Sequence, residues 1–378
     1  MIQFEGEPSF DVGIKNVKRI EEVKSGDLKS PPLKVKVLGV GGAGCNIISR
    51  IFPHSFGNVE FAACDSSIKA LSLCEGMKRF LVGESVTRGW GTGGDKEVAR
   101  RIIQEAESDI KEFLDNTNLL FVVCSLSKGL GAGASPAIFK IAKEKGVLSV
   151  GFFVLPFEFE GEECVENSKK VLEELWHLVD GAVIVSNDAL LNYSKEESGS
   201  SFSLDEAFAK IDEILEIFLQ SVEVILYRPG LISVDFADLK SFLTKGKQIM
   251  ITKGRGSGER CVEEAMEEIF YSPFWGEIPF RKVKGILLNI FAGKDFKVNQ
   301  LKKIILSLRE KAGYSIPINF GVYLERESSD DLTLTLISSV AKEPGFKGDK
   351  EPFRKELESG RYDQHDLDVP TFLRKKLT

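Results

Sequence analysis

The sequence predicts an α/β protein, in which a Rossmann-like domain with a mostly parallel sheet is followed by a long central helix and a smaller α+β C-terminal domain. Two observations predict this class. Apolar runs of strand length alternate with runs of helical period, as in parallel sheets whose strands are joined by helices. Three apolar runs are each followed by a glycine-rich segment, at 39–44, 89–94 and 129–133.

The strands of the first half follow from runs of β-branched and other apolar residues. They are expected at 33–40, 59–65, 119–126, 147–154 and 181–186. The first helix is expected to start at Asn46, after a glycine loop. All three glycine-rich segments then lie at one edge of the sheet, where ligands of such folds bind.

Three further helices are expected between these strands. Asp95 can cap a helix whose apolar residues recur every three or four positions up to Phe113. Ser135 and Pro136 have the residue types of an N-cap and a first helical position, and Gly146 is expected to close that helix. The last helix is expected at 163–178.

A long apolar stripe at 204–226 predicts a helix that is covered on most sides, as a central helix between two domains would be. Arg228, Pro229 and Gly230 are expected to end it. A second unit of four strands and two helices follows, from 248 to 339. The expected divisions are an arm at 1–32, a first domain at 33–202, the central helix at 203–227, a C-terminal domain at 228–340, a linker at 341–364 and a tail at 365–378.

Composition excludes several classes. The net charge of −7 over 378 residues argues against a nucleic-acid binder, and no apolar run approaches the roughly 20 residues of a membrane span. The first residues lack the basic start and apolar core of a signal peptide, so the chain is expected in the cytoplasm, without membrane insertion. Six cysteines without a CxxC pair, and three histidines, predict buried reduced thiols and no metal site.

The glycine-rich segments predict a phosphate site, because glycine lets backbone N–H groups approach an anion and a helix N-terminus adds partial positive charge. Gly39, Gly41 and Gly44 also satisfy the dinucleotide fingerprint, with Asp65 where a ribose-binding acid belongs. A nicotinamide-dependent oxidoreductase is therefore an alternative, although it leaves the other two segments unexplained. A further alternative is a set of tight turns without a ligand.

Asp235 and Asp238 form a second candidate site. If Asp235 begins a helix, the i, i+3 spacing places both carboxylates on one face, where they can orient water or hold a cation near a phosphate. The alternative is an ordinary helix N-terminus, which favours acidic residues through its dipole.

The order of several motifs resembles FtsZ, the tubulin-like prokaryotic cell-division GTPase, from about residue 33 to the C-terminus. The motifs are Gly41-Gly42-Ala43-Gly44-Cys45-Asn46, Ala134-Ser135-Pro136, Pro156-Phe157-Glu158-Phe159-Glu160-Gly161, Ser186-Asn187-Asp188, the run from Pro229 to Asp238, and the tail from Asp366 to Lys375.

The resemblance implies a GTP- or GDP-binding domain, with Mg²⁺ as an additional cofactor, and a filament in which each C-terminal domain stacks on the nucleotide of the next subunit. Asp235 and Asp238 would act in trans on the neighbour's γ-phosphate. The implied nucleotide-binding residues are Gly41, Gly42, Asn46, Gly91, Gly93, Gly129, Gly131 and Gly133, with Glu160 at the ribose and Asn187 and Asp212 at the guanine. Lys128 is a further candidate from the residues of this chain. The tail, from Asp366 to Lys376, would bind membrane-tethering or regulatory proteins at the division site.

Several positions depart from the family pattern. The third glycine segment has Leu130 and Ala132 in place of two threonines, with Lys128 as a candidate to offset the loss. Acidic Glu162 and Glu163 replace a basic run, and Ser67 stands where an aspartate near the metal is common. Ser233 also replaces an asparagine. These departures leave two hypotheses open: a slow GTPase, such as a divergent paralogue, and a nucleotide-independent scaffold.

Overall fold

The structure is a computed structural model that describes residues 33–54, 56–188, 203–243, 245–272, 278–313, 315–325 and 329–340. The expected arm, linker and tail lie outside the described residues.

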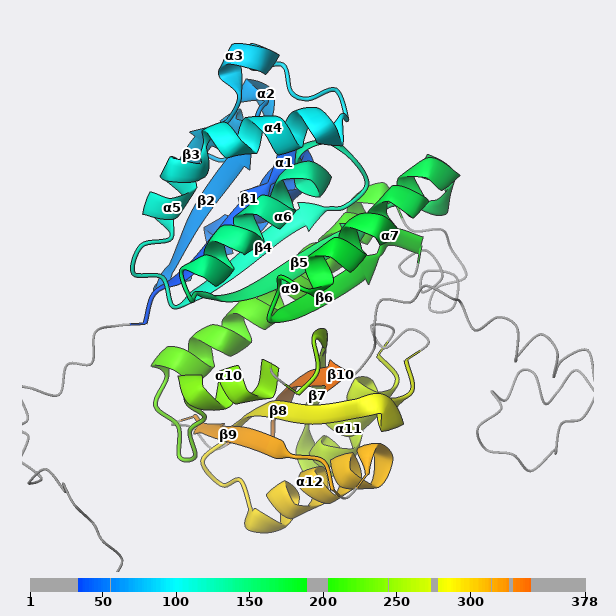
Figure 1. The fold of residues 1–378 in the computed structure, drawn as a ribbon. Coiled ribbons are helices and arrows are strands. Elements are labelled where there is room, and N and C mark those ends of the chain that lie inside the picture. Colours follow the sequence, from blue (N-terminus) through cyan, green and yellow to red (C-terminus); the bar gives the residue numbers. More distant parts are fainter. Residues whose placement is uncertain are drawn as a thin grey trace, which may run out of the picture. The chain divides into compact units, whose positions relative to one another are not determined.

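The described residues form one sheet of ten strands in the order β3-β2-β1-β4-β5-β6-β7-β10-β8-β9 (Figure 1). The first six strands are all parallel, which confirms the predicted sheet. They are β1 (Val35–Val40), β2 (Val59–Asp65), β3 (Lys78–Leu81), β4 (Leu119–Ser125), β5 (Leu148–Leu155) and β6 (Gly181–Ser186).

The C-terminal strands continue the same sheet, because β7 pairs in parallel with β6 over two residues. Strand β10 is antiparallel to both β7 and β8, and β8 is parallel to β9, so this part is mixed. The bounds are β7 (Gln248–Gly256), β8 (Val283–Ala292), β9 (Ile318–Leu324) and β10 (Leu332–Val340).

Helices cover both faces of the sheet (Figure 1). One face of β1 to β6 packs on α4 (Lys96–Glu105), α5 (Glu107–Phe113), α6 (Gly129–Glu144) and α7 (Glu162–Trp176). The other face packs on α1 (Gly41–Ile51), α9 (Leu204–Tyr227) and α10 (Phe236–Leu243). In the C-terminal part, α11 (Cys261–Phe270) and α12 (Val298–Ala312) cover the face opposite α9. Two short helices, α2 (Ile68–Ser72) and α3 (Glu84–Thr87), follow β2 and β3.

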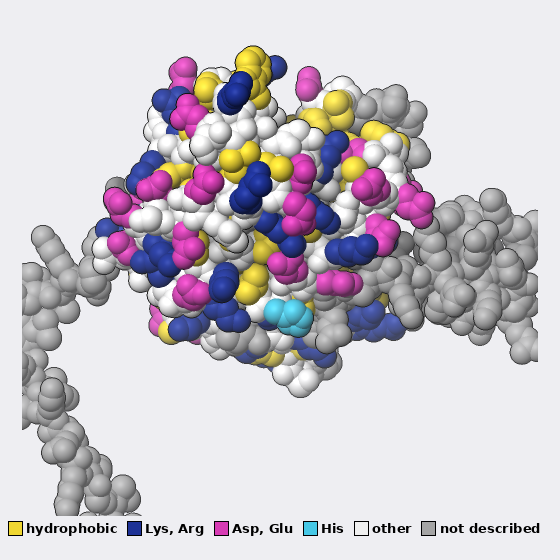
Figure 2. Space-filling model, turned by 45° about the horizontal axis from the view of Figure 1, so that its top comes forward, with side chains coloured by type: hydrophobic (Ala, Val, Ile, Leu, Met, Phe, Trp, Pro, Cys, Tyr) yellow, Lys and Arg dark blue, Asp and Glu magenta, His cyan; other side chains and the backbone are white. Residues whose placement is uncertain are grey.

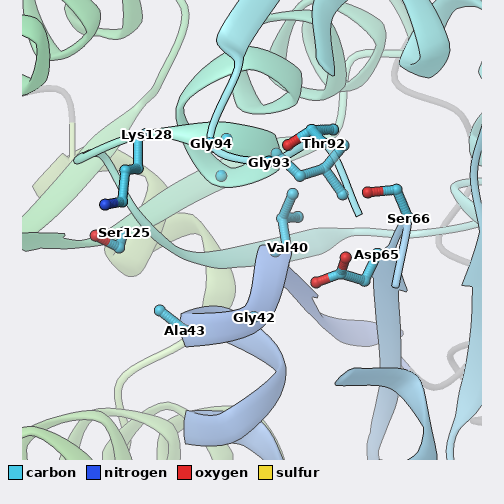
Figure 3. Close-up of a pocket in the computed structure, with 14 residues that line it drawn as sticks. Val40, Gly42, Ala43, Asp65, Ser66, Thr92, Gly93, Gly94, Ser125 and Lys128 are labelled. Atoms are coloured by element: carbon cyan, nitrogen blue, oxygen red, sulfur yellow. The ribbon is translucent and has the colours of Figure 1, made fainter. Parts of the chain in front are cut away.

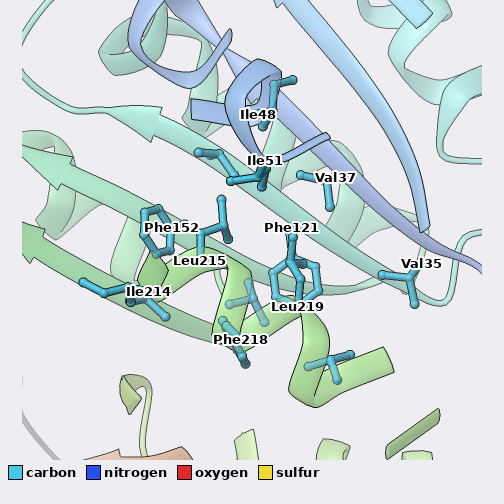
Figure 4. Close-up of a cluster of buried hydrophobic side chains, with 14 of the residues drawn as sticks. Val35, Val37, Ile48, Ile51, Phe121, Phe152, Ile214, Leu215, Phe218 and Leu219 are labelled. Carbon is cyan, nitrogen blue, oxygen red and sulfur yellow. The ribbon is translucent and has the colours of Figure 1, made fainter. Parts of the chain in front are cut away.

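Helix α9 contributes to the core of both parts of the sheet. Phe218 packs edge to face on Phe121 of β4, with ring centroids 5.1 Å apart, and Leu215 and Leu219 are fully buried beside it (Figure 4). The same cluster includes Ile251 of β7 and residues of β8 and β10. The predicted central helix is therefore confirmed, and its packing on both parts of the sheet explains why its sequence is so apolar.

The helices that follow two glycine segments begin earlier than expected. Helix α1 starts at Gly41 rather than Asn46, and α6 starts at Gly129, so Ser135 is buried inside the helix instead of capping it. A Cβ on Gly131 would lie 2.4 Å from the carbonyl oxygen of Ser125, so bare Cα atoms let the helix begin directly at the strand end. Glycine in these segments thus serves helix–strand packing more than loop flexibility.

The predicted cap at Asp95 and the predicted free cysteines are confirmed, whereas the predicted length of the helix after Asp95 is wrong. Asp95 caps α4, since its Oδ1 accepts the N–H groups of Glu97 and Val98 at 2.8 and 3.1 Å, as predicted. The helix expected to reach Phe113 is broken at Ala106 into α4 and α5. All six cysteines are unpaired, and five are buried, as expected.

The described surface carries mixed charge. Figure 2 shows Lys and Arg side chains interspersed with Asp and Glu over the face in view, without a continuous basic area on it. Among the helices that the structure describes, none combines the length and the apolar character that a bilayer crossing requires.

Candidate functional site

A pocket of about 230 Å³ lies at the carboxyl ends of β1, β2 and β4 (Figure 3). Its volume falls below the roughly 300–1,000 Å³ typical of sites that enclose a whole small molecule, so it suits part of a ligand, such as a phosphate chain. The lining residues are Val40, Gly41, Gly42, Ala43, Asp65, Ser66, Thr92, Gly93, Gly94, Ser125, Lys128, Gly129, Leu130 and Gly131.

Two helix N-termini meet at this pocket. The N-cap residues of α1 and α6 are Val40 and Lys128, and neither makes a side-chain capping hydrogen bond. Neither helix has an acidic residue in its first turn. The first N–H groups of both helices therefore receive no side-chain cap from the N-cap residue, and they carry partial positive charge. This arrangement is suited to binding an anion.

The loop between α3 and α4 closes the third side of the pocket. Gly93 and Gly94 have φ values of +64° and +88°, which other residues rarely adopt. The N–H of Gly129 donates to the carbonyl of Gly94 at 2.9 Å, so this loop is fastened to the start of α6. The second and third glycine segments therefore form one wall.

Lys128 and Asp65 are the two ionisable residues of the lining. The Lys128 side chain is exposed and passes Gly94, where a Cβ would lie 3.4 Å from Cδ of the lysine. The Asp65 carboxylate is buried at the end of β2 and accepts the N–H of Ser67 at 2.8 Å. Burial raises the pKa of Asp65, and hydrogen bonds from the N–H groups of Ser67 and Ser66 partly oppose that rise.

The pocket brings together half of the nucleotide-binding residues predicted from the sequence: Gly41, Gly42, Gly93, Lys128, Gly129 and Gly131. Two nominated glycines lie in its supporting framework. The N–H of Gly91 donates to the carbonyl of Ser66 at 3.2 Å. A Cβ on Gly133 would lie 2.4 Å from the carbonyl oxygen of Lys96, so Gly133 permits α6 to pack against α4.

Asn46 and Asp212 lie outside the lining, on the neighbouring helices α1 and α9. Asn46 is exposed on the same face of α1 as Gly42, one turn away, and Arg50 follows one turn later. The Arg50 guanidinium binds both carboxylate oxygens of Asp212, at 2.5 and 2.8 Å. Such bidentate pairs are strong and directional, so the position of Asp212 is fixed by α1.

Glu160 and Asn187 follow β5 and β6 at the same edge of the sheet. The Glu160 carboxylate accepts the N–H of Phe157 at 3.0 Å and the hydroxyl of Ser127 at 3.4 Å, which links it to the third glycine segment. Asn187 is buried, and its Oδ1 has no hydrogen-bond partner among the described residues. Asp188 accepts the N–H of Glu158 at 2.9 Å, and its pKa is raised by burial and by the charges of Glu158 and Glu160.

The paired acids lie at the start of α10, outside the lining. Asp235 accepts the N–H of Asp238 at 2.8 Å, and Asp238 accepts the N–H of Asp235 at 3.2 Å, as in a capping box. Asp238 also accepts Nδ2 of Asn319 at 2.9 Å. Between Asp212 and Tyr227, α9 rises by about 22 Å, so the chain leaves the pocket region before it reaches these acids.

Several residues of the lining were not predicted from the sequence to bind a nucleotide. The sequence suggests Asp65 only as a ribose-binding acid, and it gives no separate indication for Ser66, Thr92 and Ser125. Three of these residues occupy or directly follow the last position of β2 or β4. These three residues could have been identified from the sequence by their position at the carboxyl end of a predicted strand, where ligands of such folds bind.

Comparison with protein families gives two matches. Residues 34–195 match the Tubulin/FtsZ family, GTPase domain, and residues 247–341 match the FtsZ family, C-terminal domain. Cell division protein FtsZ of Aquifex aeolicus is 32% identical over 85% of this chain and 86% of that protein. Cell division protein FtsZ of Coxiella burnetii is 29% identical over 93% of this chain and 91% of that protein.

Solved structures show the same fold. An empty FtsZ dimer of M. jannaschii has a TM-score of 0.71 and 26% identity, over 81% of this chain and 88% of that one. CetZ2 of Haloferax volcanii, solved as a GTPγS-bound protofilament, has a TM-score of 0.67 at 20% identity, over 86% of this chain and 99% of that one. These matches leave the oxidoreductase interpretation without support.

Proposed function

The chain belongs to the FtsZ family of tubulin-like GTPases, and on that basis we propose that it binds GTP at the pocket of β1, β2 and β4 and polymerises head to tail for cell division. GTP hydrolysis would be completed across the contact between subunits. The observation that carries this proposal is the pair of uncapped helix N-termini, α1 and α6, at one pocket. Together they offer an anion several backbone N–H groups that lack side-chain caps.

Each part of the site has a proposed role. The glycines of the lining and Lys128 bind the phosphates, and Asn46 also contacts the nucleotide. Asn187 and Asp212 contact the guanine, and Glu160 contacts the ribose. The orphaned Oδ1 of buried Asn187 supports a base contact, because a buried acceptor without a partner is costly unless a ligand satisfies it. Gly91 and Gly133 support the framework around the phosphates.

Hydrolysis requires water to attack the γ-phosphorus in line with the leaving β-phosphate oxygen. We assign Asp235 and Asp238 of the adjacent subunit to orient that water and accept its proton. The reciprocal hydrogen bonds of these acids fix both carboxylates, while Asp235 stays exposed at the surface. A bound Mg²⁺ would supply charge neutralisation at the phosphates.

The test of this proposal is phosphate release and pelleting of purified protein with GTP and Mg²⁺. We expect pelleting that requires nucleotide, and turnover that rises steeply with protein concentration, because the site is complete only between subunits. Pelleting that ignores nucleotide, with no turnover, would support a second candidate function, a nucleotide-independent scaffold. The observation that favours this alternative is the loss of hydroxyl groups at Leu130 and Ala132, together with acidic Glu162 and Glu163 in place of a basic run.

Lys128→Met is expected to weaken GTP binding roughly ten- to a hundredfold, the usual contribution of a hydrogen bond to a charged group. The reason is that Lys128 is the one cationic side chain of the lining. Calorimetric titration measures the loss, and Lys140→Met, at an exposed position of the same helix, serves as the control. Equal affinity in wild type and Lys128→Met would remove the lysine from the phosphate site.

Deletion of residues 366–378 is expected to leave GTP-dependent pelleting unchanged and to abolish binding of membrane-tethering or regulatory division proteins. The reason is that filament contacts are assigned to the two domains and partner binding to the tail. Pelleting of full-length and truncated chains side by side measures the first effect. A truncated chain that no longer assembles would show that the tail has another role.

A further inference from the structure

We propose that Asn319 is a positioning residue for GTP hydrolysis: its side-chain amide holds the Asp238 carboxylate in the orientation that accepts a proton from the attacking water. This inference rests on the proposed role of Asp238. Nδ2 of Asn319, on β9, donates to Oδ1 of Asp238, on α10, at 2.9 Å. The two residues are 81 positions apart in the sequence, so the residues around either one do not indicate the contact.

The same strand also holds the segment that leads into α10. The N–H of Leu231 donates to the carbonyl of Val322 at 2.8 Å, and the N–H of Val322 donates to the carbonyl of Ile232 at 2.8 Å. A Cβ on Gly230 would lie 2.8 Å from the Val322 carbonyl oxygen, so a larger residue would push this segment off β9. Helix α10 lies beside β9 (Figure 1), and the strand therefore fixes both the approach to the helix and one of its acids.

Packing alone does not require an amide at position 319. Ile318, Phe320 and Val322 pack with the cluster around α11 and α12. Alternation along the strand therefore turns Asn319 to the other face, where α9 and α10 lie. Its register partner on β8 is Leu287, which is fully buried in the cluster on that face. An apolar side chain would suit such a site, so the amide is better explained by the carboxylate that it contacts.

The partners of Asp238 leave its carboxylate able to act as a base. An ionised carboxylate has about four lone-pair sites. Asn319 occupies one of them, and the N–H of Asp235 occupies another at 3.2 Å, so the remaining sites can accept water. No Lys, Arg or His in the described part of the chain forms an ion pair with either acid. A cation would favour the ionised carboxylate and weaken it as a base, whereas a neutral amide mainly fixes its orientation.

Loss of this amide is expected to slow hydrolysis without weakening GTP binding. Only the longer hydrogen bond from Asp235 would still hold the carboxylate, and a misplacement of about 1 Å at a reacting group can cost about a hundredfold in rate. Asn319→Leu should therefore lower GTP turnover of the assembled protein about ten- to a hundredfold. GTP affinity and pelleting should stay unchanged, because Asn319 is outside the pocket lining and lies half-buried against α10.

The experiment compares Asn319→Leu, Asn319→His and Asn319→Asp in the full-length chain, by phosphate release, calorimetric titration and pelleting. These side chains place a methyl group, an N–H donor and an acceptor, respectively, close to the position of the asparagine Nδ2. At mildly alkaline pH, where an ordinary imidazole is neutral, Asn319→His should keep most of the turnover, whereas the other two variants should be slowed. If position 319 served packing alone, Asn319→His would be the most damaging, because imidazole is the largest of the three groups.

Asn299→Leu, at an exposed position of α12, is the matched control and should behave as wild type. Thermal unfolding checks that each variant folds.

The outcomes separate this inference from the proposed function. Absence of turnover in wild type, or turnover that survives Asp238→Asn, overturns the proposed role of the acids and, with it, that of Asn319. Wild-type turnover in Asn319→Leu overturns the role of Asn319 alone. Asn319→His as slow as Asn319→Leu, or a loss explained by weaker GTP binding or reduced pelleting, would likewise show that the amide does not position the carboxylate.

Discussion

Asp238→Asn is expected to lower GTP turnover by about two to four orders of magnitude, the usual contribution of general acid–base catalysis, while GTP affinity stays unchanged. The separation of the two effects follows from the structure, because Asp238 lies at the start of α10 and does not line the phosphate pocket. Phosphate release and calorimetric titration measure the two quantities. Asp330→Asn, at an exposed position between β9 and β10, is the matched control.

A mixing experiment tests whether Asp238 acts on the neighbouring subunit. Gly42→Val should block the pocket, because Gly42 is part of its lining. A Cβ at this position meets no described atom within 4 Å, so the valine side chain can occupy that space without a clash. Neither Asp238→Asn nor Gly42→Val should turn over GTP alone. Mixed filaments should regain activity, because an Asp238→Asn subunit supplies an intact pocket and a Gly42→Val subunit supplies intact acids. A mixture as inactive as its components, although both variants co-assemble, would contradict action in trans, as would loss of GTP binding in Asp238→Asn.

Gly42→Ala and Gly44→Ala are expected to have opposite effects on stability although they lie in the same helix. A Cβ on Gly44 would lie 2.2 Å from the carbonyl oxygen of Val123, so alanine must push α1 away from β4. Overpacking of this kind typically costs about 1–3 kcal/mol of the free energy of unfolding, and occasionally more. Gly42 has open space and a helical backbone, so alanine there should be neutral or stabilising by about 0.4–1 kcal/mol.

The same pair separates folding from binding. Gly42→Ala should weaken GTP binding, because its methyl group enters the pocket where backbone and phosphate approach each other. Thermal unfolding without nucleotide and GTP titration measure the two effects. Gly42→Ala with wild-type affinity would place the phosphates elsewhere. Gly44→Ala as stable as wild type would show that the contact between α1 and β4 is looser than the structure has it.

Much of the fold could be predicted from local pattern. Five of the first six strands, β1, β2, β4, β5 and β6, coincide with continuous apolar runs, because strands buried on both faces need no alternation. Strand β3 was missed, since it is four residues long and begins with Lys78 and Arg79. The junction of β6 with β7 was also missed, because it depends on pairing between residues distant in sequence.

In the candidate site too, contacts between residues distant in sequence could not be predicted. Glycine-rich segments pointed to the pocket, but their helical conformation depends on contacts such as that of Gly131 with Ser125, which the sequence does not display. The i, i+3 spacing of Asp235 and Asp238 indicated their shared helix turn, and the structure adds their reciprocal hydrogen bonds. The bidentate pairing of Arg50 with Asp212 joins two distant helices and could not be read from either one.

The central claim is that backbone N–H groups at the starts of α1 and α6 bind a guanosine polyphosphate even though this chain lacks the threonine hydroxyl groups at Leu130 and Ala132. Calorimetric titration of GTP into the purified chain with Mg²⁺ tests it most directly. We expect saturable binding of one nucleotide per chain, with an affinity lowered by Lys128→Met. Absence of any binding at saturating GTP, in a protein shown to be folded, would contradict it.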